Sequence, residues 1–161
     1  MNTNRALLKT SSTARNASDR EFVATAAPDG AAEVALGRLA ASKTGDAKIR
    51  EFANRMIEDH SWVCAELRRI AESKGIKVSD APTAEQQAAR RRLESLEGES
   101  FDHEYARLAR EDHDRAIEVF SRESRSGVEP ALKEFAARTL PKLEMHRKMA
   151  QELAAVDRPQ G

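Results

Sequence analysis

Residues 49–60 read IREFANRMIEDH, and this stretch decides the fold class. Its apolar side chains, continued by those of residues 63–67, recur at steps of three and four, which describes one stripe of an α-helix. His60 falls in the middle of that stripe, where a helical bundle would normally carry a leucine. The stretch therefore predicts a buried helix with one polar group on its buried side.

Two parts of this stretch recur later in the chain. The tripeptide EDH of residues 58–60 returns at residues 111–113, and residues 132–140 repeat residues 49–57 almost position by position. Equivalent helices at such an offset predict two similar helical hairpins joined by a long crossover that contains a short helix. This arrangement is an all-α, ferritin-like four-helix bundle. Simple up-down-up-down winding, with the connecting segment folded to the side, is the alternative.

The composition supports this fold class and excludes several partners. A chain of 161 residues forms one domain, and 4% aromatic residues are too few for a typical sheet protein. The 27 basic and 27 acidic residues cancel, so we expect no nucleic-acid partner. No run approaches the roughly 18 apolar residues of a membrane span, which predicts a soluble chain. Assembly into a homo-oligomer is left open, and the sequence names no protein partner.

The first residues of the chain bear on its location. Residues 1–20 hold one short apolar run, at positions 6–8, which is far shorter than the hydrophobic region of a signal peptide. We therefore expect a cytoplasmic protein from the sequence as written. A periplasmic or exported protein is expected if a signal segment is missing from it.

Start and stop signals divide the chain into a tail at residues 1–18, predicted to be disordered, a bundle domain at 19–155 and a second tail at 156–161. The long helices are expected to follow the capping or first-turn residues Ser18, Asp46, Ser100 and Pro130, and a short connecting helix to follow Thr83. Gly45 suits a left-handed closing residue for the first helix. Pro28 predicts a kink or restart, and Pro141 a bend.

Each of the four long helices places a metal-ligating residue type near the centre of its apolar stripe. At 100° per residue, these residues lie on or beside the apolar face of their helices. At 1.5 Å per residue, they lie near the middle of each helix. The candidate metal ligands are Glu33, His60, His113, His146 and Asp112. Asp112 is either a further ligand or an acceptor for an imidazole N–H.

Such a set of side chains favours a cation. A buried carboxylate is costly unless it is paired or coordinates a cation, and neutral imidazole commonly binds transition metals. Three histidines and a glutamate could together hold one divalent ion, zinc first and iron or copper next. A buried network of histidines and carboxylates with no metal would satisfy the same groups. Glycine-rich phosphate loops, paired CxxC motifs and hydrolase elbows do not occur in the sequence.

These motifs resemble a known family over about residues 19–154. The similarity runs through EVALG at residues 33–37, FA at 52–53, DH at 59–60 and 112–113, and LKEFA at 132–136 followed by His146. It is to the bacterial family called domain of unknown function 4142, which has a ferritin-like fold. The resemblance implies metal chemistry by analogy of fold alone.

One departure limits the analogy to ferritins. The dinuclear ferritin motif needs a glutamate three residues before a histidine on two helices, but Ile57 and Leu143 occupy those positions. The leading hypothesis is therefore a non-enzymatic or weakly catalytic protein that binds a single transition-metal ion. The competing hypothesis is a metal-free interaction or stress-protection module whose polar core fixes the bundle. An enzyme ranks third, because no catalytic group lies outside the same set of residues.

Overall fold

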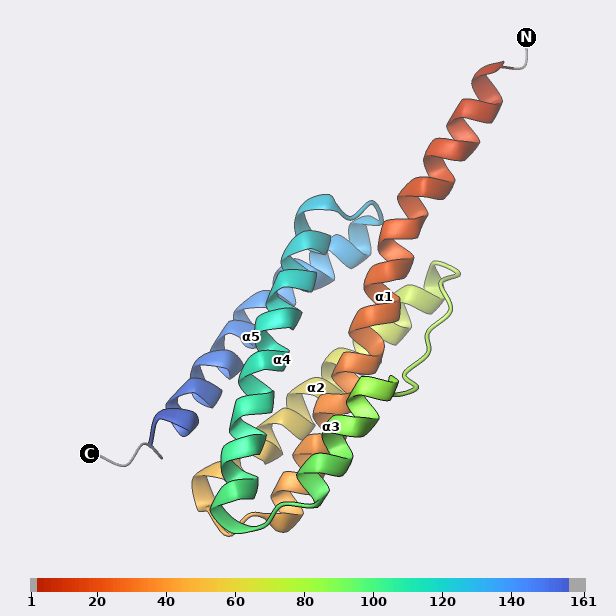
Figure 1. The fold of residues 1–161 in the computed structure, drawn as a ribbon. Coiled ribbons are helices and arrows are strands. Elements are labelled where there is room, and N and C mark those ends of the chain that lie inside the picture. The colour runs from red at the N-terminus through yellow and green to blue at the C-terminus, as the bar shows by residue number, and fades with distance from the viewer. Residues whose placement is uncertain (1–2, 157–161) are drawn as a thin grey trace.

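The computed structural model describes residues 3–156, with side chains described for residues 17–155, and is entirely helical over this range (Figure 1). The helices are α1 (Thr3–Lys43), α2 (Ala47–Ser73), α3 (Ala84–Glu94), α4 (Gly98–Ser126) and α5 (Pro130–Val156). The all-α prediction is confirmed. None of the helices within residues 3–156 is both long and apolar enough to cross a membrane.

The four long helices pack side by side. Helix α1 packs mainly against α2, and α4 packs mainly against α5, while α1 also contacts α4 and α2 also contacts α5. The short helix α3 lies on the outside, against α1 and α4 (Figure 1). Each histidine-bearing helix therefore has two long neighbours, and their inward faces share one interior.

The start of α1 differs from the expected one. The helix begins at Thr3, not near Ser18, and residues 3–17 contain no glycine or proline that would break it. The helix start predicted near Ser18 was therefore wrong, whereas the division of the chain into tails and a bundle domain stays a prediction. Residues 1–2 and the predicted tail at 157–161 lie outside the described residues.

Both internal prolines lie within continuous helices. Helix α1 continues through Pro28 and α5 continues through Pro141, so the first helix does not restart at Pro28. The alternative of a kink at Pro28, and the bend at Pro141, stay predictions. The closing role predicted for Gly45 was also wrong, because its backbone does not adopt positive φ. The guanidinium of Arg50 instead donates to the carbonyl of Thr44, which satisfies a backbone group after the end of α1.

Other helix ends follow the predicted chemistry. The carboxylate of Asp46 accepts hydrogen bonds from the first-turn amides of α2. Thr83 and Gln86 form a reciprocal capping box at the start of α3. Gly75 follows α2 with a φ of 71°, a conformation that glycine adopts without steric cost. These local signals fix where the chain turns.

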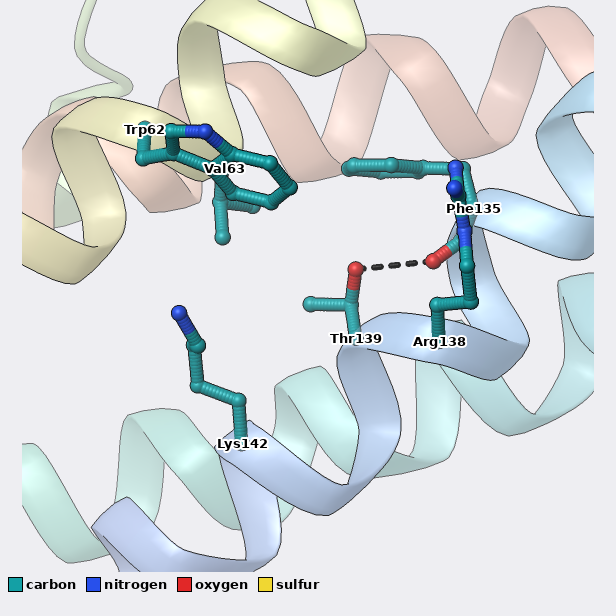
Figure 2. A pocket seen from close by; sticks show the side chains of 6 residues that line it. All are labelled: Trp62, Val63, Phe135, Arg138, Thr139 and Lys142. Atoms are coloured by element: carbon teal, nitrogen blue, oxygen red, sulfur yellow. Dashed lines mark hydrogen bonds between the residues drawn. The ribbon is translucent and has the colours of Figure 1, made fainter.

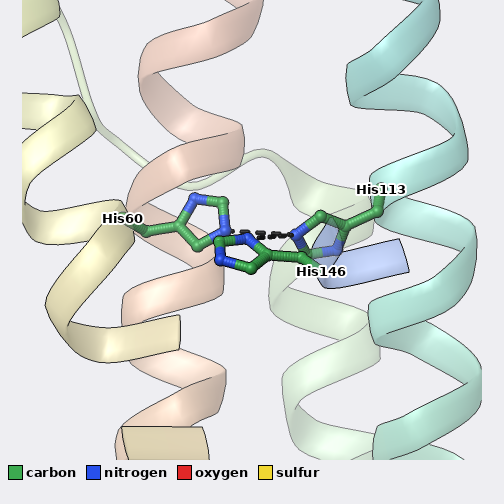
Figure 3. A group of neighbouring side chains, drawn as sticks. All are labelled: His60, His113 and His146. Carbon is green, nitrogen blue, oxygen red and sulfur yellow. Dashed lines mark hydrogen bonds between the residues drawn. The ribbon is translucent and has the colours of Figure 1, made fainter. Parts of the chain in front are cut away.

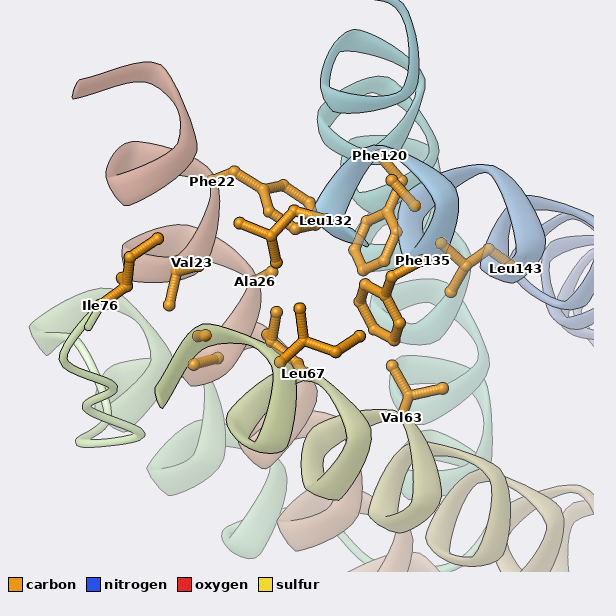
Figure 4. Packing of buried hydrophobic residues seen from close by; sticks show 14 residues of the cluster. Phe22, Val23, Ala26, Val63, Leu67, Ile76, Phe120, Leu132, Phe135 and Leu143 are labelled. Atoms are coloured by element: carbon orange, nitrogen blue, oxygen red, sulfur yellow. The ribbon is translucent and has the colours of Figure 1, made fainter. Parts of the chain in front are cut away.

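The buried apolar residues form two clusters along the bundle. One cluster packs the middle of α1 against the later part of α2, the later part of α4 and the first half of α5 (Figure 4). The second packs the end of α1 against the first halves of α2 and α4 and the later part of α5, and it includes Leu93 of α3. The residues between the clusters, one per long helix, are Glu33, His60, His113 and His146. The bundle therefore carries a polar layer between two apolar ones.

Candidate metal centre

Three histidine side chains meet in the polar layer. His60 comes from α2, His113 from α4 and His146 from α5, and their rings point toward one another (Figure 3). Nε2 of His60 lies 3.2 Å from Nε2 of His113, which in turn lies 3.3 Å from Nδ1 of His146. Each histidine offers one nitrogen within 4.8 Å of the others, and all three are buried. The group could hold a metal ion.

The outer nitrogens of two of these rings have fixed partners. Nδ1 of His113 lies 2.7 Å from the carbonyl oxygen of Ala109, one turn earlier on α4. Nε2 of His146 lies 2.7 Å from a carboxylate oxygen of Asp59 on α2. Both partners only accept hydrogen bonds, so each of these outer nitrogens carries the ring proton and donates it.

The inner nitrogens of His113 and His146 consequently carry no proton. In a neutral imidazole one nitrogen donates and the other offers a lone pair, so the Nε2 of His113 and the Nδ1 of His146 present lone pairs to each other. Burial lowers the pKa of His113 to about 4 and is also the main cause that lowers the pKa of His146 and, well below its usual range, that of His60. All three rings are therefore neutral near pH 7.

The spacing of the nitrogens suits tetrahedral coordination. Imidazole nitrogens bound to zinc at about 2.0–2.1 Å are held about 3.3–3.4 Å apart along the edge of a tetrahedron. The two short separations, 3.2 Å from His60 to His113 and 3.3 Å from His113 to His146, are close to that edge. Two of the three separations therefore match tetrahedral coordination, and the third, between His60 and His146, is within 4.8 Å.

Asp59 supports His146 from outside the histidine group. Burial opposes ionisation of Asp59, but the hydrogen bond from His146 and the nearby Lys142 outweigh it and lower its pKa. Lys142 Nζ lies 3.4 Å from one carboxylate oxygen, and Arg55 Nε lies 3.4 Å from the other. Asp59 is thus a charged acceptor that fixes the tautomer and orientation of His146.

Glu33 lies at the level of the histidines but has different neighbours. On α1 it falls between Gly30, which faces Cys64, and Gly37, which faces Met56, so it is level with the middle of α2. The residue is 5% exposed, both carboxyl oxygens are buried, and neither has a hydrogen-bond partner of ordinary geometry. Burial, followed by the charge of Asp112, raises its pKa well above the usual range. Both effects favour the protonated form of Glu33.

Asp112 lies beside Glu33 and not in the histidine group. It pairs with Arg115 one turn later on α4, while burial raises its pKa. The acceptors that hold imidazole N–H groups are the Ala109 carbonyl and the Asp59 carboxylate. The structure thus brings the three predicted histidines together and places the two predicted carboxylates in a neighbouring pair. Their role as ligands stays a prediction.

Asp59 is the functional residue that the sequence interpretation missed. Its signal was the repeated EDH tripeptide, in which the aspartate precedes an inward histidine in both copies. A residue adjacent to His60 on the same helix points to a different side, toward a neighbouring helix. The partner of Asp59 is accordingly His146 on α5 and not the histidine beside it.

The whole bundle matches one protein family. The family model described as a domain of unknown function, DUF4142, covers residues 5–153. The chain belongs to this family. Membership of DUF4142 confirms the resemblance drawn from the sequence motifs, and all three histidines and Asp59 lie within the matched range. No curated protein and no solved structure gives a significant match to the chain.

Proposed function

We propose that this DUF4142 protein binds one divalent transition-metal ion through Nε2 of His60, Nε2 of His113 and Nδ1 of His146. Zinc is the first candidate, and iron or copper is next, because neutral imidazole suits all three metals. The observation that carries the proposal is the 3.3 Å contact between the inner nitrogens of His113 and His146. Two lone pairs in a buried space favour a cation between them.

A metal-free network accounts for this contact less well. His60 can carry its proton on Nε2 and donate it to His113 at 3.2 Å. One proton satisfies one lone pair, so the inner nitrogen of His146 would stay without a donor of its own. Protonating a further ring would supply the missing donor, but burial opposes that charge. One metal ion satisfies all three inner nitrogens at once.

The carboxyl group of Glu33 is proposed as an additional ligand, with Asp112 beside it as its partner. Three protein ligands leave a fourth position of a tetrahedral ion for water or another group. Glu33 is level with the histidines, and its oxygens have no other protein partner. A bound cation would favour the ionised form of Glu33 and thereby offset the cost of burying its charge.

We also propose that the bundle has ferritin-like connectivity with a single-ion centre. Support comes from the two helical hairpins and from the long connection between them, which contains α3. The positions that would complete a dinuclear motif are Ile57 and Leu143, neither of which can bind a metal. A role in binding, storing or sensing one ion fits these residues better than oxidation chemistry at two irons.

Thermal unfolding with and without zinc tests the proposed function. A ligand at one hundred times its dissociation constant stabilises a folded protein by about 2.7 kcal/mol. For a chain of this size, that free energy raises the melting temperature by roughly 5–10 °C. We expect this increase on adding zinc to chelator-treated protein and its loss in His113→Leu. An unchanged melting temperature in both proteins would instead support the metal-free interaction module.

A further inference from the structure

A hollow lies on the surface between α2 and α5, outside the histidine group. It has a volume of about 200 Å³. Its apolar lining residues are Trp62 and Val63 of α2 and Phe135 of α5, and its polar lining residues all lie on α5 (Figure 2). The polar lining residues are Arg138, Thr139 and Lys142. The hollow thus combines an apolar surface with two cationic side chains and has no acidic lining residue.

The tryptophan of this hollow is unusually open to solvent. Trp62 is 58% exposed, the largest exposure among the large hydrophobic residues at positions 17–155. Nζ of Lys142 lies 5.4 Å from the centroid of its ring, within the range of a cation–π contact. An exposed aromatic face beside a cation offers both stacking area and charge to a bound molecule.

The two cationic side chains of the hollow have different charged neighbours. Lys142 lies 3.4 Å from an oxygen of Asp59, which neutralises part of its charge from the inner side. Arg138 is exposed, lines the hollow and has a charge interaction with Glu66. Both side chains can donate to an anion without losing a buried partner.

We propose that this hollow binds a small organic anion, namely a carboxylate on a planar apolar body. The apolar body would stack on Trp62, while Arg138 and Lys142 would hold the carboxylate. The volume suits a small molecule, because it lies below the range of typical drug-sized pockets. The site is independent of a metal ion, although Lys142 also contacts the Asp59 that orients His146.

The single tryptophan of the chain allows a direct test with benzoate. Trp62 lines the hollow, so its fluorescence reports occupancy without a label. In the full chain, with chelator present to exclude metal effects, we expect benzoate to change the emission in a saturable manner. Benzyl alcohol, which lacks the charge, and inorganic phosphate, which lacks the apolar body, should bind at least about tenfold more weakly.

Substitutions of the two cations complete the experiment. Lys142→Gln and Arg138→Gln should each weaken benzoate binding about tenfold, and Lys148→Gln, an exposed lysine on the same helix, should leave it unchanged. Titration calorimetry on Trp62→Phe, with benzoate as ligand, gives a readout that does not depend on fluorescence. The absence of saturable binding by both methods would overturn the proposal. Equal binding of phosphate or benzyl alcohol, or no effect of Lys142→Gln, would overturn it as well.

Discussion

Nδ1 of His146 lies 3.3 Å from Nε2 of His113, and the outer nitrogen of each ring donates its proton elsewhere. The pair is therefore two acceptors in a buried layer, with His60 beside them. Two apolar clusters close this layer from above and below along the bundle. The outer hydrogen bonds thus fix which nitrogen of His113 and of His146 carries the proton, with or without a bound ion. Such outer partners commonly orient metal-binding histidines.

Replacement of Asp59 tests whether its hydrogen bond with His146 matters for metal binding. In Asp59→Asn the carboxylate charge is lost, and the amide can present its NH₂ group to His146 and favour the wrong tautomer. We expect zinc affinity to fall about 10–100-fold, measured by competition with a chromophoric chelator. Asp114→Asn is the matched control, because Asp114 is an exposed carboxylate next to His113 that pairs with Arg147. Equal affinities of the two variants would remove Asp59 from the account.

Glu33→Gln tests whether Glu33 binds the metal as a carboxylate or is only a neutral neighbour of the histidines. Burial and the charge of Asp112 favour the protonated form of Glu33, and glutamine resembles that form in size and charge. Without metal, the free energy of unfolding should change by about 1 kcal/mol or less. Zinc affinity should fall about tenfold or more, because glutamine cannot become an anion. Unchanged affinity would limit the centre to the three histidines.

A second buried acid, at the far end of α4, predicts how stability depends on pH. Burial, followed by hydrogen bonding to Asp19, raises the pKa of Glu123 from 4.5 to about 8. Between these values the folded state holds a proton that the unfolded state has released. The contribution of Glu123 to stability is therefore complete below pH 4.5 and falls as pH rises to about 8.

Urea unfolding of Glu123→Gln measures this contribution. The variant should approach the stability of the natural protein at the acidic end of the window and exceed it near pH 8, because glutamine stays neutral. The carboxylate of Asp19 accepts hydrogen bonds from the amides of Val128 and Glu129, so this acid pair also positions the turn into α5. Parallel pH profiles of both proteins would contradict the shifted pKa.

Gly127 ends α4 in a space with no room for a side chain. A Cβ atom there would lie 2.5 Å from Oε1 and 2.6 Å from the carbonyl oxygen of Glu123. We expect Gly127→Ala to lower the free energy of unfolding by about 1–3 kcal/mol, measured by urea denaturation. Gly45→Ala is the control, because a Cβ at Gly45 meets nothing within 4 Å and should leave stability unchanged or slightly higher. Similar losses in both variants would contradict the steric explanation.

Periodicity predicted the helices and the inward histidines because burial imposes a helical repeat on the apolar residues. The same arithmetic placed His60, His113 and His146 in one layer, and the structure brings their rings together. It could not show that Asp59 would hold His146, because this contact depends on how α2 packs against α5. Packing between helices also decides that Asp112 lies beside Glu33.

Local signals were less reliable where several conformations have similar energies. Ser18 offered a capping side chain, but residues 3–17 contain no glycine or proline to break the helix, and α1 extends back to Thr3. Gly45 could have closed the helix in a left-handed conformation, but its φ is not positive. The side chain of Arg50 satisfies the carbonyl of Thr44 instead. Capping succeeded at Asp46 and Thr83, where one side chain satisfies specific backbone amides.

The metal content of protein purified without a histidine tag tests the central claim most directly. The natural chain should carry close to one equivalent of a transition metal, or take up one equivalent of zinc after treatment with a chelator. His60→Leu combined with His113→Leu should keep the helical content, because leucine suits a buried stripe, and should bind no metal. Failure of the natural chain to bind any equivalent, or equal binding by the double variant, would contradict the account.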